Sequence, residues 1–211
     1  MMKHYRLLLL PLFWLFFSAI AFGDGGSGNT GTVKGTITID GSPAAGIVVS
    51  IEGLPTKYIE SHVANIASKR AVIDQRDKKF IPHVLPVLAG TTVDFPNNDN
   101  TWHNVFSTSE IKKFDLGLYP SGDHRNVTFA NPGVVRILCN VHPNMEAYVV
   151  VKGHPFFAVS DTRGNYRLAA VPVGRYRLEI WHPELGTKVV PFHLTRVGEV
   201  LVVDMDLKRM R

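Results

Sequence analysis

The sequence has very little cysteine, because Cys139 is the single cysteine among 211 residues. One thiol forms no disulfide within the chain, and it excludes paired-cysteine zinc sites and redox dithiols. Charge is also scarce: charged residues make up 19% of the chain and the net charge is +5. So small a positive excess gives no argument for a nucleic-acid partner, and we expect none.

Long apolar runs are missing from the chain except near its start. There, a basic beginning precedes an apolar run from Leu7 to Phe17, and Ala19-Ile20-Ala21 supplies small residues for cleavage. This pattern predicts a signal peptide over 1–23, followed by a flexible linker over 24–30. An uncleaved membrane anchor is the alternative. We expect a periplasmic or secreted protein, with no stable membrane insertion after signal cleavage.

Apolar and polar residues alternate in the first part of the remaining chain, as they do in strands with one buried face. The alternation runs from Val33 to Ile39 and resumes from Ile47 to Ile51, with an Asp40-Gly41 turn after the first run. These two runs predict a β-hairpin. A helix is the expected exception at Thr56 to Arg70, where apolar residues have helical spacing.

Strand-like runs also fill the middle and the end of the sequence, so the predicted fold class is all-β. Gly, Pro and Asn residues between the runs mark turns, among them the segment Asp161 to Asn165. The runs are Val84 to Leu88, Thr92 to Phe95, Asn126 to Phe129, Val134 to Leu138, Ala147 to Val151, Tyr166 to Ala170, Tyr176 to Ile180 and Val203 to Leu207.

One short loop carries a thiol, an imidazole and a thioether, from Cys139, His142 and Met145. A second imidazole, His103, lies upstream between Trp102 and an asparagine. Two His, one Cys and one Met are the ligands of a blue-copper electron-transfer centre, because soft sulfur favours Cu(I) while imidazole also suits Cu(II). Zinc is the chief rival, since a Cys, two His and a fourth donor form a tetrahedral site, but Met is an unusual zinc ligand.

Several segments around these residues match one known family. They are Val87-Leu88-Ala89-Gly90-Thr91-Thr92-Val93, Phe95-Pro96-Asn97-Asn98-Asp99, His103-Asn104-Val105 and Asn131-Pro132-Gly133. With them, the chain resembles the cupredoxins over about Ile73 to Val151. The Cys-x-x-His-x-x-Met spacing looks most like amicyanin, whose ligand loop is shorter than that of plastocyanin. The segment from Phe106 to Gly117 also resembles the cupredoxin-like methylamine utilisation proteins.

This resemblance implies a cupredoxin Greek-key β-sandwich over 71–152 that holds one type 1 copper. It implies that the metal ligands are His103, Cys139, His142 and Met145. In the family, the asparagine after the first histidine holds the loop and hydrogen-bonds near the cysteine sulfur, a supporting role that Asn104 would take.

The flanking segments resemble a second family. Phe156 to Leu168 and Val171 to Leu178 look like the later strands of the carboxypeptidase regulatory-like, transthyretin-type sandwich, and Val33 to Thr38 looks like its opening strand. The resemblance implies a discontinuous sandwich of 31–53 plus 155–207, with the cupredoxin domain inserted in it, since exposed loops tolerate inserted domains. The alternative is three modules in a row.

The expected function is a one-electron carrier, and we expect no enzymatic activity, because no phosphate-binding loop and no Ser-His-Asp context appears. A copper storage or delivery protein and a non-redox β-sandwich binding module are the alternatives. The resemblance implies a redox partner such as a c-type cytochrome or a periplasmic dehydrogenase. It also implies that His142 is the electron exit, with Pro143 beside it on the docking face.

The remaining notable side chains have ordinary interpretations. Trp102 is expected either to shield the metal or to pack in the core. Six other histidines are expected to be structural or surface residues, and the basic residues near 69–79 and 112–113 to be solvated charge. These histidines are His62, His83, His124, His154, His182 and His193.

Overall fold

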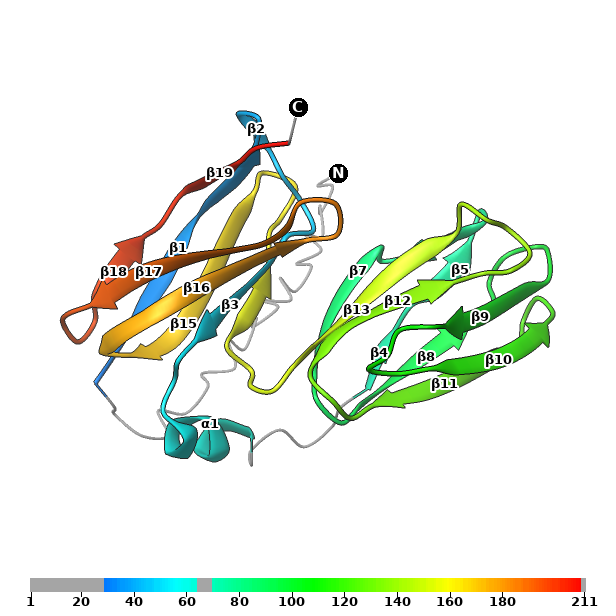
Figure 1. Cartoon of the computed structure of the whole chain (residues 1–211), viewed down its shortest axis with the longest axis horizontal. Coiled ribbons are helices and arrows are strands. Elements are labelled where there is room, and N and C mark those ends of the chain that lie inside the picture. The colour runs from blue at the N-terminus through cyan, green and yellow to red at the C-terminus, as the bar shows by residue number, and fades with distance from the viewer. Residues whose placement is uncertain (1–28, 64–69, 210–211) are drawn as a thin grey trace, which may run out of the picture.

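The computed structural model describes residues 29–63 and 70–209, and within these ranges the chain is nearly all β (Figure 1). Two groups of sheets lie beside each other, one coloured green and the other made of blue, orange and red strands. No helix in the described ranges is long and apolar enough to cross a membrane. The predicted signal peptide, 1–23, and all but the last two residues of the predicted linker lie outside these ranges.

The first group, which we call the central sandwich, is built from ten strands. They are β4 (Arg70–Val72), β5 (Asp74–Arg76), β6 (Lys79–Ile81), β7 (Val84–Leu88), β8 (Thr91–Pro96), β9 (His103–Ser107), β10 (Phe114–Tyr119), β11 (His124–Phe129), β12 (Gly133–Leu138) and β13 (Glu146–Lys152). One sheet has the order β10-β9-β12-β13-β7 and the other β11-β8-β4, with β5 and β6 as a separate pair. Their inner faces share a core that includes Phe95, Phe129 and Ile137. Burial of these alternating apolar residues is the main source of stability.

The second group, which we call the flanking sandwich, takes its strands from both ends of the described chain. They are β1 (Thr30–Ile39), β2 (Ser42–Pro43), β3 (Val48–Glu52), β14 (Phe157–Val159), β15 (Asn165–Pro172), β16 (Gly174–His182), β17 (Gly186–Leu194), β18 (Val200–Val202) and β19 (Met205–Leu207). One sheet centres on β1, which pairs with β15, β18, β19 and β2, and the other has the order β14-β3-β16-β17. A separate core, with Ile37, Ile51 and Leu178, lies between these sheets.

The predicted helix forms over part of its range, as α1 (Thr56–Val63), while residues 64–69 lie outside the described chain. No side chain of α1 is fully buried. Tyr58 anchors it to the flanking sandwich, because its hydroxyl donates to the Ala170 carbonyl and its ring stacks 5.3 Å from that of Phe156.

The prediction of a hairpin between Val33–Ile39 and Ile47–Ile51 is wrong. Asp40 and Gly41 do turn the chain, both with positive φ, but the strand after the turn is the short β2. The chain then crosses to the opposite sheet, where β3 pairs with β14 and β16. Both segments bury one face in the same core. Apolar and polar residues therefore alternate in the same way whether the two strands pair within one sheet or face each other from opposite sheets.

The predicted strand from Val203 to Leu207 forms only over Met205–Leu207, because Val203 and Asp204 lie in a break between β18 and β19. The Val203 amide donates to the Lys34 carbonyl, and Asp204 turns its side chain to accept from the Thr36 amide at 2.7 Å. β18 and β19 therefore pair with β1 on either side of this break. The break brings the Val203 carbonyl so close to Gly35 that a Cβ there would lie 2.0 Å from the oxygen.

The two sandwiches meet in a small apolar contact of Val48 and Trp181 with Val84 and Val150. The Trp181 ring lies 5.6 Å from the ring of Tyr148. Beside this contact, Lys152 of β13 reaches across to the flanking sandwich, where its Nζ lies 2.5 Å from Glu179 and 3.5 Å from Glu52. The Lys152 side chain is 11% exposed, so an apolar contact and a shielded ion pair together hold the sandwiches.

Trp181→Ala should lower the free energy of unfolding by about 3 kcal/mol, because it removes a buried aromatic side chain and leaves a cavity. Chemical denaturation followed by circular dichroism measures the change. Trp102→Ala is the matched control, since Trp102 is 52% exposed, and it should change the free energy by less than about 0.5 kcal/mol. Equal effects of the two variants would contradict the described contact.

Candidate metal centre

His103 is the first residue of β9, and its side chain is completely buried. Antiparallel pairing places it opposite Tyr119 of β10. Neither β9 nor β10 is among the strand-like runs that the sequence predicts. Their pairing fixes the backbone on which His103 stands, so its imidazole has little freedom to move.

Asp99 holds the imidazole of His103 in one orientation. Its Oδ2 lies 2.9 Å from His103 Nε2 and also accepts from the Lys78 amide at 2.7 Å. Burial alone raises the pKa of Asp99, but the amide of Lys78, the imidazole of His103 and the amide of Asn100 together lower it to about 2. An ionised carboxylate can only accept, so Nε2 carries the proton. The lone pair of His103 is therefore on Nδ1.

Cys139 follows the last residue of β12, and Met145 precedes the first residue of β13. The loop between them closes on itself, because the Met145 amide donates to the His142 carbonyl and the Cys139 amide to the Met145 carbonyl. Cys139 is 5% exposed and Met145 is 1% exposed. Both belong to the core of the central sandwich, which holds this loop against the end of the sheet.

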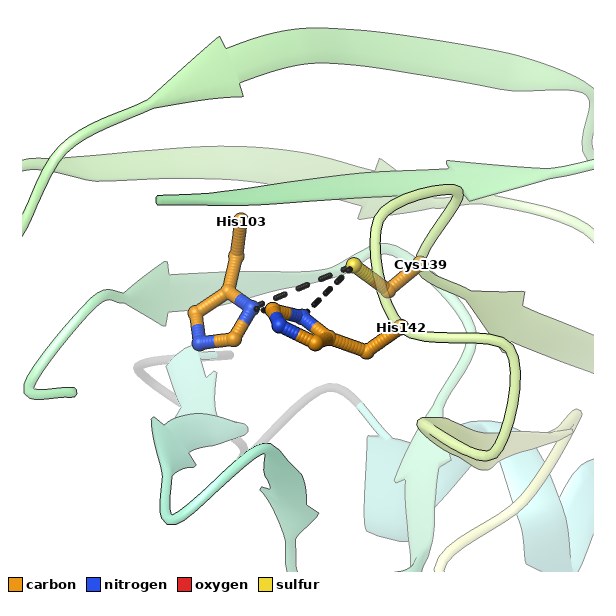
Figure 2. A group of neighbouring side chains, drawn as sticks. All are labelled: His103, Cys139 and His142. Carbon is orange, nitrogen blue, oxygen red and sulfur yellow. Dashed lines mark hydrogen bonds between the residues drawn. The ribbon is translucent and has the colours of Figure 1, made fainter. Parts of the chain in front are cut away.

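Three donor atoms converge where this loop meets β9 (Figure 2). The Cys139 sulfur lies 3.9 Å from Nδ1 of His103 and 3.9 Å from Nδ1 of His142. The two Nδ1 atoms are 3.1 Å apart. A trigonal site with metal–nitrogen bonds of about 2.0 Å and a metal–sulfur bond of about 2.3 Å needs donor separations of roughly 3.5–3.7 Å. The side chains therefore fit a single metal ion.

The acid–base state of the cluster also suits a metal. Burial, followed by the proximity of His103 and Lys78, lowers the pKa of His142. A neutral imidazole keeps the lone pair that a metal ligand needs. Among the described residues, none of the other histidines joins a group of three metal-binding side chains.

Two further residues, Met145 and Asn104, are expected to take part in the site. Met145 is buried in the same loop, and no hydrogen bond from Asn104 to the sulfur of Cys139 is found in the described chain. Instead, the Asn104 side-chain amide donates to Asp115 at 2.6 Å, and its Oδ1 is buried with no partner. The role of Met145 as a metal ligand and the supporting role of Asn104 stay predictions.

The surface over the cluster is partly open. His142 is half-buried, Pro143 is exposed, and Val141 is 44% exposed. Trp102, directly before His103, is 52% exposed and so is not a core residue. The loop that carries His142 is thus the part of the cluster nearest to solvent.

Sequence reasoning gave Asp99 no role, although it lies in one of the quoted segments. Asn97, two positions before it, is fully buried, and its side-chain amide donates to the Thr101 and Tyr119 carbonyls. Asp99 and His103 are four positions apart, and in a loop this spacing does not indicate that two side chains are in contact. The contact becomes visible only in the structure, where a turn brings Asp99 back to His103.

Three solved structures illustrate what the chain is similar to. A purple cupredoxin from Nitrosopumilus maritimus is 26% identical, and the match covers 39% of this chain and 99% of that chain with a TM-score of 0.37. A mutant of amicyanin in its reduced state is 25% identical over 49% of this chain and 98% of that chain, with a TM-score of 0.37. A copper-containing nitrite reductase from Thermus scotoductus is 24% identical over 39% of this chain and 22% of that chain, with a TM-score of 0.38. No protein-family profile and no curated protein matches the sequence.

Asp99→Asn should weaken metal binding by 10- to 100-fold. The native carboxylate orients His103 and raises the donor strength of its imidazole, and the variant removes that carboxylate. Titration with Co²⁺, followed by the thiolate-to-metal absorption, measures the affinity. Glu110→Gln is the matched control, since its side chain is 88% exposed and pairs with Lys113. An affinity of the Asp99 variant within two-fold of the native one would show that this carboxylate does not support the site.

Proposed function

We propose that the chain is a type 1 copper protein that carries single electrons. The observation that carries this proposal is the convergence of the Cys139 sulfur with Nδ1 of His103 and of His142, at separations of 3.1–3.9 Å. These three residues would hold the copper as strong ligands, and Met145 would be a weak fourth ligand. One thiolate, two imidazoles and a thioether favour copper over zinc, for which a thioether is an unusual donor.

The fold itself restrains the donors. His103, Cys139 and Met145 are all buried, and hydrogen bonds fix both the imidazole of His103 and the ligand loop. When bound, copper supplies a one-electron change between Cu(I) and Cu(II). A donor set held in one geometry rearranges little during that change, which is what an electron carrier requires. A catalytic site needs room for substrate at the metal, and the described cluster is enclosed except at His142.

We propose His142 as the electron exit, with Pro143 on the docking face. His142 is the half-buried member of the cluster, and the apolar Val141 and the ring of Pro143 flank it at the surface. Small and weak encounters of this kind are typical of redox pairs. The proposed partner is a c-type cytochrome or a periplasmic dehydrogenase, and the predicted signal peptide supports a periplasmic or secreted location.

We also propose that the flanking sandwich is one discontinuous domain, 31–53 plus 155–207, with the cupredoxin domain, 71–152, inserted in it. The strand pairing supports this division, because β1 pairs with β15, β18 and β19, while β3 pairs with β14 and β16. Every main-chain ladder thus stays within one of the two sandwiches.

The oxidised protein should bind one Cu²⁺ and show an intense visible absorption from the short bond between copper and the Cys139 sulfur. Cys139→Ser should abolish the colour. Met145→Gln should keep it and shift the reduction potential, while Met205→Gln in the flanking sandwich should leave both unchanged. A native protein that stays colourless with Cu²⁺, or that binds zinc alone, would argue against this assignment.

Pro143→Glu should change the bimolecular rate of electron exchange with a c-type cytochrome by about ten-fold, because a charge on the docking face alters the encounter. Stopped-flow mixing at low ionic strength measures the rate. Val197→Glu places the same charge on the flanking sandwich, where Val197 is 63% exposed, and should leave the rate unchanged. If the rate with every candidate partner is insensitive to the Pro143 variant, the docking face lies elsewhere.

A fragment of 71–152 should fold and bind copper alone, because its core and its ladders lie within it, apart from the Arg70–Thr92 pair that starts the ladder of β4 with β8. Its unfolding midpoint should fall below that of the full chain, since it lacks the contact with Trp181. Far-UV circular dichroism and visible absorption test both points. Failure of the fragment to fold unless 31–53 is supplied would favour three modules in a row.

A further inference from the structure

Two cationic side chains stand directly opposite each other on the outer face of the flanking sandwich. Antiparallel pairing of β1 with β15 sets Lys34 opposite Arg167, and the preceding pair, Val33 and Leu168, is buried. Residues alternate between the faces of a sheet, so Lys34 and Arg167 project together to the outer face. Like charges directly opposite each other destabilise a sheet.

Neither cation is neutralised within the described chain. No ion pair within 4.0 Å joins Lys34 or Arg167 to a carboxylate there, and Arg167 only donates to the Thr32 hydroxyl at 3.2 Å. The nearby carboxylates serve the backbone: Asp161 accepts from the amides of Arg163 and Asn165, and Asp204 accepts from the Thr36 amide. Within the described chain, the pair is therefore not joined to a carboxylate by a direct ion pair, although Asp161 and Asp204 line the same groove.

The same two cations line a groove of about 710 Å³. Thr36 and Asn165 form a nearby cross-strand pair and add a hydroxyl and an amide to it. Val202 and Val159, which are 55% and 39% exposed, give the groove apolar surface. Asp161 and Asp204 complete its lining with hydrogen-bond acceptors.

This lining selects one class of ligand. The adjacent Lys and Arg donors suit a single carboxylate group, which accepts from both. The carboxylates and the amide around them can form hydrogen bonds with hydroxyl groups of a ligand. The exposed valines can pack against the C–H face of a saturated ring. The two aspartates disfavour a dense polyanion such as nucleic acid or polyphosphate, because they repel its further charges.

We propose that this groove binds a carboxylated sugar, a uronic acid unit, with Lys34 and Arg167 on its carboxylate. The bound carboxylate lies between the two cations and offsets part of their charge, so binding reduces the repulsion that the free protein carries. The flanking sandwich then attaches the protein to an acidic polysaccharide. This assignment is independent of the metal and of the electron-carrier proposal.

Isothermal titration of the full chain with trigalacturonate tests the proposal, with galactotriose as the neutral control and acetate and phosphate as simple anions. Trigalacturonate should bind, and Lys34→Gln and Arg167→Gln should each weaken it at least ten-fold. Arg175→Gln, an exposed arginine on the other sheet, should not. Absence of binding, equal binding of acetate or phosphate, or binding unchanged in both variants would overturn the proposal.

Thermal unfolding at low salt without ligand gives a second measurement. Lys34→Gln should keep or raise the unfolding midpoint, because it removes the repulsion between Lys34 and Arg167. In 0.5 M salt, the variant and the native protein should have equal midpoints, because salt screens the same repulsion in the native protein. A lowered midpoint would show that Lys34 is a structural residue and would overturn the premise of the site. The visible spectrum with copper should be unaffected by either variant.

Discussion

The hydrogen bond between Asp99 and His103 Nε2 is the contact on which the candidate metal centre depends. It decides which nitrogen of a fully buried imidazole keeps its lone pair, and it turns that nitrogen toward Cys139. Without an acceptor at Nε2, a buried N–H would be left unpaired at a cost of about 1–3 kcal/mol. Asp99 thus satisfies a requirement of folding and prepares a metal ligand with the same bond.

The loop of Cys139, His142 and Met145 supplies the remaining donors from the opposite direction. Its ends continue β12 and β13, which pair from Gly133 and Val151 to Leu138 and Glu146 and so fix the distance between the two ends of the loop. Backbone hydrogen bonds inside the loop leave few alternative conformations. The donors are held by the sandwich itself.

The flanking sandwich contributes at a distance from this centre. It packs on β7 and β13 through Trp181, and Lys152 connects to its carboxylates in a shielded environment. A contact this small and partly charged holds two cores together without merging them. The two sandwiches therefore keep separate ligand chemistry, with the Cys139 and histidine donors in one and the groove lined by Lys34 and Arg167 in the other.

The all-β class, the central strands β7, β8, β11, β12 and β13, and the proximity of His103 to the Cys139 loop could be predicted from the sequence. Alternation and residue type are local signals, and the ligand loop is a short segment with an uncommon set of side chains. Alternation does not say which strands pair, so the predicted hairpin of Val33–Ile39 with Ile47–Ile51 is wrong. Asp99 and the Lys34–Arg167 pair depend on a turn and on a ladder register, which local sequence does not encode.

X-ray absorption at the copper edge of the loaded protein tests the central claim most directly, because it counts the atoms bonded to the metal. The account predicts one short copper–sulfur bond from Cys139 and two copper–nitrogen bonds from His103 and His142. Loss of the sulfur shell in Cys139→Ser, with nitrogen retained, is the expected companion result. A native spectrum with nitrogen and oxygen neighbours alone would contradict the account.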